Sequence, residues 1–315
     1  MRALLIVNPH ATSTTQLHRD VIASALASAV ELEVMQTRYR GHAAGLAATA
    51  AAGGCGLIIT LGGDGTVNEA VNGIMRAAGP DGTPGPAAAR PALAALPGGN
   101  ANVFTRSLGL PASPVDAAGH VLHALGAGRE RTIGLGLADG RYFAFNAGLG
   151  LDAEVVRAVE GRRAHGVPLT PAMYARTALR QYFRLTDRRR PALSLEVGGT
   201  VVAERLYIGI VSNTAPWTFL GRRPVQASPA AAFEAGLDLL ALRSLRAPAT
   251  ARVLAQMLVR RSAGPAGGSV LALHDQPGFT LTAGRPVAMQ VDGEYVGERE
   301  RVRFCAAPRA LRVVV

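Results

Sequence analysis

The sequence predicts two domains: an N-terminal α/β domain built on a parallel sheet, then an antiparallel β domain with helical insertions. The chain has 315 residues, and about 150 residues per domain is common. Apolar runs alternate with helix-like segments as far as residue 128, which is typical of a parallel sheet with helices on both faces. After residue 130, short strand-like runs separated by turn residues follow one another, which indicates antiparallel strands.

In the first domain, the apolar run 3–7 predicts a buried strand that ends at Asn8-Pro9. The segment 79–91 is rich in Pro and Gly and predicts an exposed connection. The other expected elements are helices and strands in alternation: helix 16–30, strand 31–36, helix 42–52, strand 56–61, helix 66–78, strand 92–96 and helix 114–126. Glycines interrupt the uncharged stretch 43–63, so we do not interpret it as a membrane span.

In the second domain, the alternation of short apolar runs with turns predicts eight strands. They lie at 131–137, 141–147, 192–197, 201–212, 236–243, 279–282, 287–291 and 301–305, and helical insertions are expected near 152–185 and 248–261. We therefore expect the first domain to span residues 1–130, with the last residues, 308–315, returning to it, and the second to span 131–307.

The composition excludes some chemistries. All 33 basic residues are arginine, and with 22 acidic residues the net charge is +11. Without lysine there is no Schiff-base catalysis and no Walker-A loop. Codon bias is the favoured reason for the missing lysine, and the exclusions hold in either case. The two cysteines support no disulfide framework, so a reducing cytoplasm fits best. The N-terminal run is too short for a signal peptide.

Three turns follow strands of the expected parallel sheet. Gly62-Gly63-Asp64-Gly65-Thr66 joins a buried strand to a helix, and helix N-termini bind anions through unpaired N–H groups. Asp64 would act there through magnesium or a ribose hydroxyl, and the alternative is a turn or N-cap residue. The second turn carries Asn100 and Asn102, and the third spans 8–12. Three turns on one sheet edge favour a phosphate-binding cleft.

The chain resembles the diacylglycerol kinase catalytic-domain family, most closely its soluble bacterial lipid kinases, which are related to the sphingosine kinases. The resemblance rests on five motifs in order: Asn8-Pro9, Gly62–Glu69, Leu96–Asn102, Phe145–Ala153 and Val291–Glu294. Gly-Gly-Asp-Gly-Thr alone is shared with NAD kinases and, in part, with phosphofructokinases. The family implies ATP-dependent phosphorylation of a lipid hydroxyl, an α/β nucleotide domain and a β-sandwich-like second domain.

The resemblance also implies the site residues and the cofactors, ATP and Mg²⁺. Glu294 would accept the proton, with Asp292 beside it, and Asp64 would help to fix the magnesium ion. The residues expected to contact ATP are Asn8, Pro9, His10, Ala11, Thr12, Thr37, Gly62, Gly63, Asp64, Gly65, Thr66, Val67, Asn68, Asn100 and Asn102.

Two departures from the family pattern concern metals. Many diacylglycerol kinases have Thr where this chain has Asn100, and Asn-Asp where it has Asn102-Val103, so a carboxylate of their magnesium network is missing. Some members also use an Asp-Gly for a structural magnesium site, where this chain has Ala235-Gly236. We therefore do not predict that second site.

The late motif Val291-Asp292-Gly293-Glu294 has two interpretations. In an extended segment, Asp292 and Glu294 would face the same side and reach one site, where a carboxylate could take the proton of the attacking hydroxyl. The alternative is a β-hairpin with Asp-Gly at its turn. Both can hold at once.

Between Arg157 and Arg190 there are nine arginines and only two acidic residues. Arg176, Arg180 and Arg184 are spaced to share one helical face, with most apolar residues of that segment expected away from it. Such a helix can rest on an anionic membrane surface, and a solvated helix face is the alternative. We therefore expect a cytoplasmic, peripherally membrane-associated protein that does not bind nucleic acid. The oligomeric state is open, a homodimer included.

The leading interpretation is an ATP-dependent lipid kinase acting on a diacylglycerol-like, sphingoid or isoprenoid lipid. The alternatives are a small-molecule kinase similar to NAD kinase and a non-catalytic protein that binds nucleotide or lipid. The motif Asp292-Gly293-Glu294 and the segment 96–104 argue against NAD kinase.

Overall fold

The computed structural model describes residues 1–11, 15–76, 87–165, 170–259 and 264–315. The chain divides into two compact units. Unit 1 comprises Met1–Leu135 and Pro308–Val315, and unit 2 comprises Gly136–Ala307. The chain leaves unit 1 within strand β5 (Glu130–Ala138) and returns to it within strand β16 (Glu294–Val314).

Unit 1 is a parallel sheet between helices, in the strand order β2-β1-β3-β4. Val313 near the end of β16 extends it, pairing in parallel with Leu93. The elements are β1 (Arg2–Val7), α1 (Gln16–Ala27), β2 (Glu31–Gln36), α2 (His42–Ala52), β3 (Leu57–Gly62), α3 (Asp64–Arg76), η1 (Ala87–Ala89), β4 (Ala92–Pro97), α4 (Val103–Ser107) and α5 (Pro114–Gly126).

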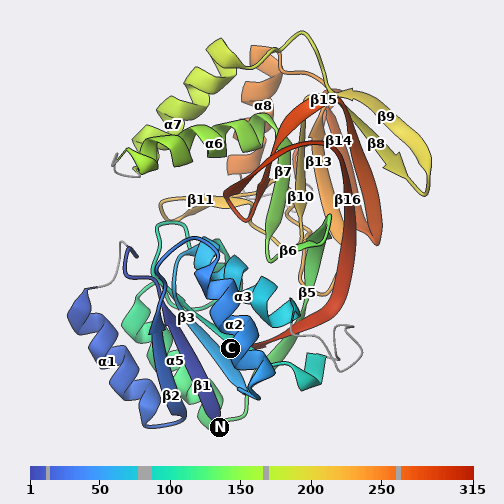
Figure 1. Ribbon diagram of the computed structural model, residues 1–315. Coiled ribbons are helices and arrows are strands. Elements are labelled where there is room, and N and C mark those ends of the chain that lie inside the picture. The colour runs from blue at the N-terminus through green and yellow to red at the C-terminus, as the bar shows by residue number, and fades with distance from the viewer. Residues whose placement is uncertain (12–14, 77–86, 166–169, 260–263) are drawn as a thin grey trace. The chain divides into compact units, whose positions relative to one another are not determined.

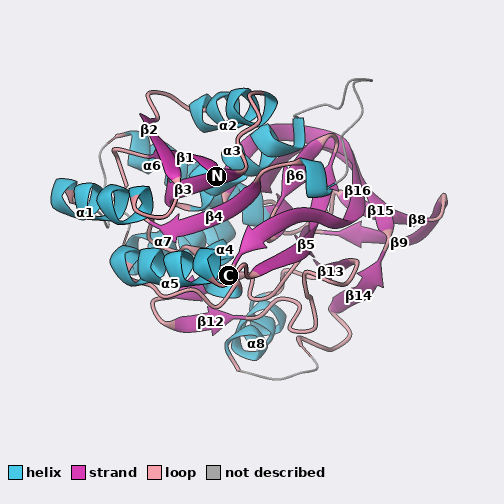
Figure 2. Ribbon diagram, turned by 90° about the horizontal axis from the view of Figure 1, so that it is seen from below, coloured by secondary structure: helices cyan, strands magenta, loops and turns pink. Residues whose placement is uncertain are grey.

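The apolar pattern of these strands explains the layers. β3 and β4 are buried along their whole length, as expected for central parallel strands covered on both faces. One set of their side chains packs with α1 and α5 in a single hydrophobic core. Figure 2 shows α2 and α3 on one face of this sheet and α5 on the other.

Unit 2 is built on antiparallel strands, in the order β14-β13-β10-β7-β15-β16, with the pair β8–β9 attached to β15 and β6 paired with β5 (Figure 1). Its elements are β6 (Arg141–Phe143), β7 (Asn146–Gly150), α6 (Leu151–Ala164), α7 (Pro171–Arg180), the π-helical turn η2 (Gln181–Leu185), β8 (Leu193–Val197), β9 (Thr200–Leu206), β10 (Ile208–Ser212), β11 (Thr218–Leu220), β12 (Arg223–Val225), β13 (Leu237–Leu242), α8 (Ala247–Leu258), β14 (Val270–Gln276) and β15 (Gly278–Val291).

The predicted fold class, α/β followed by antiparallel β, is confirmed. The main differences lie in unit 2: β11, β12 and β14 were not predicted, and the predicted strands 141–147 and 201–212 are each divided in two. The runs 279–282 and 287–291 form one strand, β15, with a register shift between Thr282 and Val287. The predicted insertion 152–185 is two helices, because Thr170 caps a new helix that has a proline in its first turn, a combination that favours a helix start.

The arginine-bearing helix also differs from expectation. The turn η2 replaces the last α-helical turn, which shifts residues relative to the face on which Arg176 and Arg180 lie. The buried residues of α7 and η2 include Met173, Thr177 and Tyr182. Several apolar side chains of this segment that were expected to face away from the arginines are exposed instead. The segment is not simply basic on one side and buried on the other.

Within the described residues, none of the helices is both long and apolar enough to span a bilayer.

Candidate functional site

The three turns predicted to bind phosphate follow β1, β3 and β4, which are neighbours in the sheet of unit 1. Hydrogen bonds join these turns directly. The backbone N–H of Asn8 donates to the carbonyl of Leu61 (3.0 Å), and that of Gly98 donates to Gly62 (2.7 Å). The Asn8 side-chain amide donates to the Thr66 hydroxyl at 3.3 Å. The structure therefore brings these turns together at one sheet edge.

The glycines allow two of the turns to touch, backbone against backbone. A Cβ atom built on Gly98 would lie 2.9 Å from the Cα of Gly62, and one on Gly99 would lie 2.7 Å from the Cα of Gly63. Real Cβ atoms do not approach backbone atoms this closely. Gly98 and Gly99 are therefore needed for contact between the turns, whatever ligand they bind.

We expect Gly98→Ala to destabilise unit 1 by roughly 1–3 kcal/mol, a common effect of overpacking, because the turn at Gly62 is displaced. Thermal unfolding measures the loss of stability. Gly119→Ala in α5 is the matched control, since a Cβ there meets nothing within 4 Å. A Gly98→Ala variant as stable as the wild type would contradict this account of the turn.

The N-terminus of α3 offers donors that the protein does not use. Over the part of the chain that the structure describes, the backbone N–H groups of Gly63, Asp64 and Gly65 have no hydrogen-bond acceptor. They stand at the positive end of a 13-residue helix. Unpaired amides with the helix dipole behind them form a site for phosphate or another anion.

The side chain of Asp64 serves another helix. Its Oδ2 accepts from the N–H of Val103 (3.0 Å) and its Oδ1 from that of Phe104 (3.1 Å), at the start of α4. Burial raises the pKa of Asp64 to about 6, against the lowering effect of the two amides and of Arg106. The alternative of a capping residue thus describes Asp64, although the helix it caps is α4 rather than its own.

Glu69, in the same motif, was not singled out as functional by sequence. Its carboxylate accepts from the N–H of Gly41 (2.7 Å) and from that of Ala43 (3.1 Å), at the start of α2. The N–H of Thr37 donates to the carbonyl of Val7 at 2.9 Å. Glu69 therefore fixes the loop between Thr37 and α2. Local capping patterns connect residues that are close in sequence, so they do not reveal this long-range contact.

Other predicted ATP contacts shape the turns. The Asn102 amide accepts from the N–H of Gly99 (2.9 Å) and donates to its carbonyl (2.7 Å). Val67 and Asn68 are 2% and 0% exposed, so neither side chain is accessible to a ligand. Asn100 is exposed.

In the first turn, the side chain of Asn8 accepts from the N–H of His10 (2.9 Å). The carbonyl of Asn8 accepts from the N–H of Ala11 (3.1 Å), and that of Pro9 from Arg19 (2.7 Å). Thr12 lies outside the described residues.

In unit 2, Asp292 and Gly293 form a two-residue hairpin turn between β15 and β16. Val291 pairs with Glu294, and the φ angles of Asp292 and Gly293 are +47° and +77°, as a type I′ turn requires. The hairpin interpretation is confirmed. The argument that alternation places Asp292 and Glu294 on the same side is wrong, because a turn residue does not follow strand alternation.

The two carboxylates have different surroundings. Asp292 is 2% exposed and accepts from three backbone N–H groups: Ala144 at 2.7 Å, Phe145 at 3.0 Å and Asn146 at 3.1 Å. Glu294 forms an ion pair with Arg141 at 2.9 Å, and its side chain is 19% exposed. Asp292 therefore anchors the hairpin, while Glu294 is the carboxylate accessible to solvent. Arg141 was not identified from the sequence.

A buried polar network lies behind this hairpin. The Gln290 side chain accepts from the N–H of Gly293 (2.9 Å) and donates to Asn146 (2.9 Å) and Asp152 (2.8 Å). The Asn146 amide donates to the carbonyl of Trp217 at 2.8 Å. Burial raises the pKa of Asp152 to about 6, partly offset by the hydrogen bond from Gln290.

The Asp152 pKa predicts a pH dependence. Its folded value, about 6, exceeds the ordinary 3.8, so the folded state binds this proton more tightly. Its contribution to stability is present in full below pH ~4 and is lost as the pH rises through ~6. The stability difference between wild type and Asp152→Asn should fall by ~3 kcal/mol between those limits, at ~1.4 kcal/mol per pKa unit. Chemical unfolding measured across that range tests this, and parallel curves would contradict it.

The region of Ala235-Gly236 is occupied by protein hydrogen bonds. The N–H of Gly236 donates to Asp275 at 2.6 Å. Asp238 contacts the His274 ring at 2.8 Å and accepts from the N–H of Asp275 at 3.0 Å. In the described ranges, no group of three or more His, Cys, Asp or Glu side chains could hold a metal ion.

Residues 2–137 match the family model of the diacylglycerol kinase catalytic domain. The chain is 35% identical over 154 residues to a diacylglycerol kinase of Bacillus subtilis, covering 47% of this chain and 46% of the relative. It is 36% identical over 113 residues to a probable YegS-like lipid kinase of Chromohalobacter salexigens, covering 36% of this chain and 33% of the relative. The matches thus span less than half of these curated relatives.

The likeness of fold extends further. A solved structure of a putative diacylglycerol kinase from Bacillus anthracis superposes with a TM-score of 0.76 at 22% identity, covering 99% of this chain and 96% of that one. A second structure from this organism gives a TM-score of 0.72, also at 22% identity. The resemblance suggested by the five motifs is confirmed: residues 2–137 match the diacylglycerol kinase catalytic domain, and the curated relatives that the chain matches are named as diacylglycerol or lipid kinases.

Proposed function

We propose that the protein is a lipid kinase that transfers the γ-phosphate of ATP to a lipid hydroxyl. The observation that carries the proposal is the set of three unused N–H groups at the start of α3, on Gly63, Asp64 and Gly65. They suit the phosphates of a nucleotide and need no lysine. The curated relatives, named as diacylglycerol kinases and a probable lipid kinase, support a lipid as the acceptor.

A magnesium ion at this site would have few ligands from the protein. Mg²⁺ bound with substrate phosphates commonly uses one or two carboxylates and several waters. Asp64 is the carboxylate at the turn, and both its oxygens already accept amide hydrogen bonds. In the proposal, Asp64 would hold the ion through water, and the ion would neutralise charge on the phosphates.

The protein's own groups then have separate tasks. The α3 amides bind and orient the phosphates, which matters because phosphoryl transfer depends mainly on positioning and charge stabilisation. Glu294 accepts the proton of the lipid hydroxyl. At the same time the hydroxyl oxygen forms a bond to the γ-phosphorus, and the bond from this phosphorus to ADP breaks. Arg141 orients the Glu294 carboxylate through their ion pair.

ADP release in mixed micelles tests the proposal and narrows the acceptor. Separate micelles would carry diacylglycerol, a sphingoid base or a long-chain isoprenoid alcohol, with ATP and Mg²⁺ present. We expect ADP release that requires one of these lipids. ATP binding without lipid-dependent ADP release from any of them would favour a non-catalytic nucleotide-binding protein instead.

A further inference from the structure

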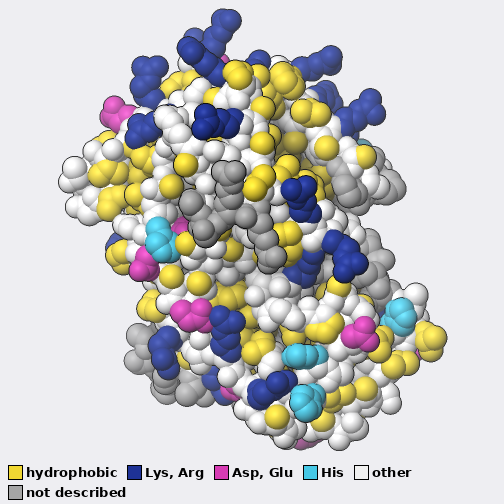
Figure 3. Space-filling view, turned by 180° about the vertical axis from the view of Figure 1, so that it is seen from behind, with side chains coloured by type: hydrophobic (Ala, Val, Ile, Leu, Met, Phe, Trp, Pro, Cys, Tyr) yellow, Lys and Arg dark blue, Asp and Glu magenta, His cyan; other side chains and the backbone are white. Residues whose placement is uncertain are grey.

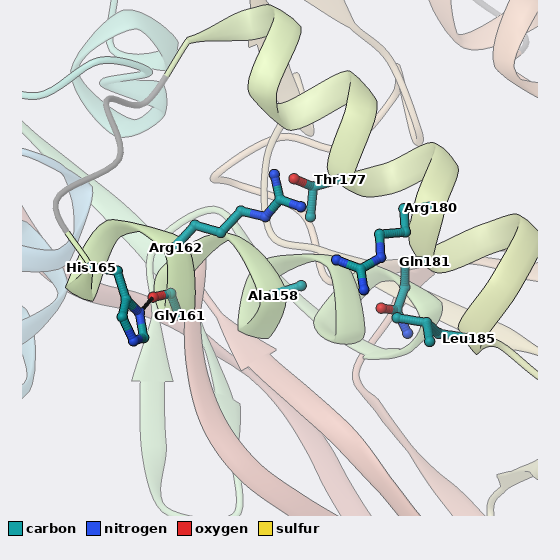
Figure 4. Close-up of a pocket in the computed structure, with 8 residues that line it drawn as sticks. All are labelled: Ala158, Gly161, Arg162, His165, Thr177, Arg180, Gln181 and Leu185. Atoms are coloured by element: carbon teal, nitrogen blue, oxygen red, sulfur yellow. Dashed lines mark hydrogen bonds between the residues drawn. The ribbon is translucent and has the colours of Figure 1, made fainter.

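A pocket of about 330 Å³ lies within unit 2, between α6 and the segment formed by α7 and η2. Its size is at the lower end for small-molecule sites, ~300–1,000 Å³. The lining residues come from both sides: Ala158, Gly161, Arg162, His165, Thr177, Arg180, Gln181 and Leu185. The guanidinium groups of Arg162 and Arg180 lie in the space between the helices (Figure 4).

Two polar side chains that line this pocket, Thr177 and Gln181, already donate hydrogen bonds to the protein. The Thr177 hydroxyl donates to the carbonyl of Met173 at 2.8 Å. The Gln181 side chain donates to Glu154 at 3.0 Å, and the same Glu154 oxygen accepts from the Thr186 hydroxyl at 2.6 Å. The Glu154 carboxylate is therefore held by neutral donors rather than by an arginine.

The two arginines have no such partner. Among the described residues, the guanidinium groups of Arg162 and Arg180 have no hydrogen-bond or ion-pair partner. Two guanidinium groups that share one pocket repel each other, and an anion between them would turn repulsion into attraction. Guanidinium groups bind phosphate in a bidentate manner, so the pocket suits a phosphate group.

The surface around the pocket is apolar as well as basic. Pro171–Leu185 contains three arginines and no acidic residue. Its exposed apolar side chains are Tyr174 at 41%, Leu179 at 57%, Phe183 at 54% and Leu185 at 59%. Figure 3 shows hydrophobic and arginine side chains interspersed at the end of unit 2 that carries α7 and α8. Basic and apolar residues together are typical of helices that lie in a membrane interface.

We propose that the pocket between α6 and α7 binds the phosphate of an anionic phospholipid, with Leu179, Phe183 and Leu185 entering the boundary between headgroups and acyl chains. A soluble phosphate ester would satisfy Arg162 and Arg180 but would leave these apolar side chains in water, which favours a lipid. The inference rests on the proposed function in one respect: a lipid kinase must work at a lipid surface.

Vesicle sedimentation without ATP tests this inference. Vesicles of phosphatidylcholine alone are compared with vesicles that also contain phosphatidylglycerol. Arg162→Gln/Arg180→Gln should weaken binding to the anionic vesicles about 30-fold, at ~1 kcal/mol per arginine near an anionic surface. Arg301→Gln/Arg303→Gln on β16 removes the same charge elsewhere in unit 2 and should change binding only a few-fold. Thermal unfolding confirms that both variants fold.

A second pair of variants tests the apolar contribution. Leu179→Ser/Phe183→Ser should weaken binding to the anionic vesicles about tenfold. This difference from the wild type should persist at high salt concentration. Val201→Ser/Val202→Ser on β9 is the control, since those side chains are 54% and 50% exposed. Wild-type binding by both test variants, or displacement from vesicles by soluble glycerol phosphate, would overturn the inference.

Activity and vesicle binding separate the two proposals. Anionic vesicle binding that depends on Arg162 and Arg180, in a protein that phosphorylates no lipid, would refute the proposed function and support the pocket. Lipid phosphorylation by a protein that binds neutral and anionic vesicles equally would support the proposed function and refute the phosphate-binding pocket.

Discussion

Replacing Glu294 with glutamine is expected to lower kcat about 10²–10⁴-fold, the usual contribution of a positioned general base. Glutamine keeps the shape of the side chain but cannot accept the hydroxyl proton. ATP affinity should stay within about threefold of wild type, because the amides proposed to bind phosphate belong to α3. Steady-state ADP release and calorimetric ATP binding measure the two quantities.

Glu298→Gln is the matched control for this experiment. Glu298 also lies on β16 and pairs with an arginine, Arg157, at 3.0 Å, with both side chains about half exposed. Ion pairs of this kind contribute little to stability, ~0–1 kcal/mol, so the control should keep its activity. Turnover at the wild-type rate in Glu294→Gln would remove Glu294 as the proton acceptor.

Replacing Asp292 with asparagine is expected to destabilise unit 2 by roughly 2–4 kcal/mol, because hydrogen bonds to charged groups each contribute ~1.5–3 kcal/mol. The carboxylate accepts three backbone N–H groups. An asparagine offers one oxygen, and its own NH₂ would face an N–H donor. Activity should fall because the hairpin that carries Glu294 loses its anchor. Thermal and chemical unfolding measure the loss of stability.

Asp139→Asn is the control for Asp292→Asn. Asp139 also opens an Asp-Gly turn with positive φ, +45°, but it is exposed and accepts from the Arg303 N–H at 2.9 Å. Its replacement should cost much less stability. A fully stable Asp292→Asn variant that has lost its activity would contradict the anchoring role and favour a direct role in catalysis.

The sequence predicted the sheet of unit 1 and its turns well, because a buried parallel strand, a glycine turn and a helix start are local patterns. The hairpin at Asp292-Gly293 could also be predicted, since Asp-Gly between apolar residues favours a type I′ turn. The proximity of Asp292 and Glu294 was argued from strand alternation, and this argument failed where the chain turns.

Long-range caps could not be predicted from the sequence. Asp64 accepts from residues 39 and 40 positions away, and Asp292 accepts from residues about 147 positions earlier. Arg141 and Glu294 are 153 positions apart. Nothing local to these residues specifies such partners, because the tertiary fold alone brings them together. For the same reason, the sequence could not show that the arginines Arg162 and Arg180 share a pocket.

Transfer of labelled γ-phosphate from ATP to a total lipid extract tests the central claim most directly. Mass spectrometry of the labelled product would identify the acceptor lipid. The account predicts a lipid phosphate monoester that forms with the wild-type protein and is reduced at least 10²-fold with Glu294→Gln. No labelled lipid from the wild type, or equal labelling by both proteins, would contradict it.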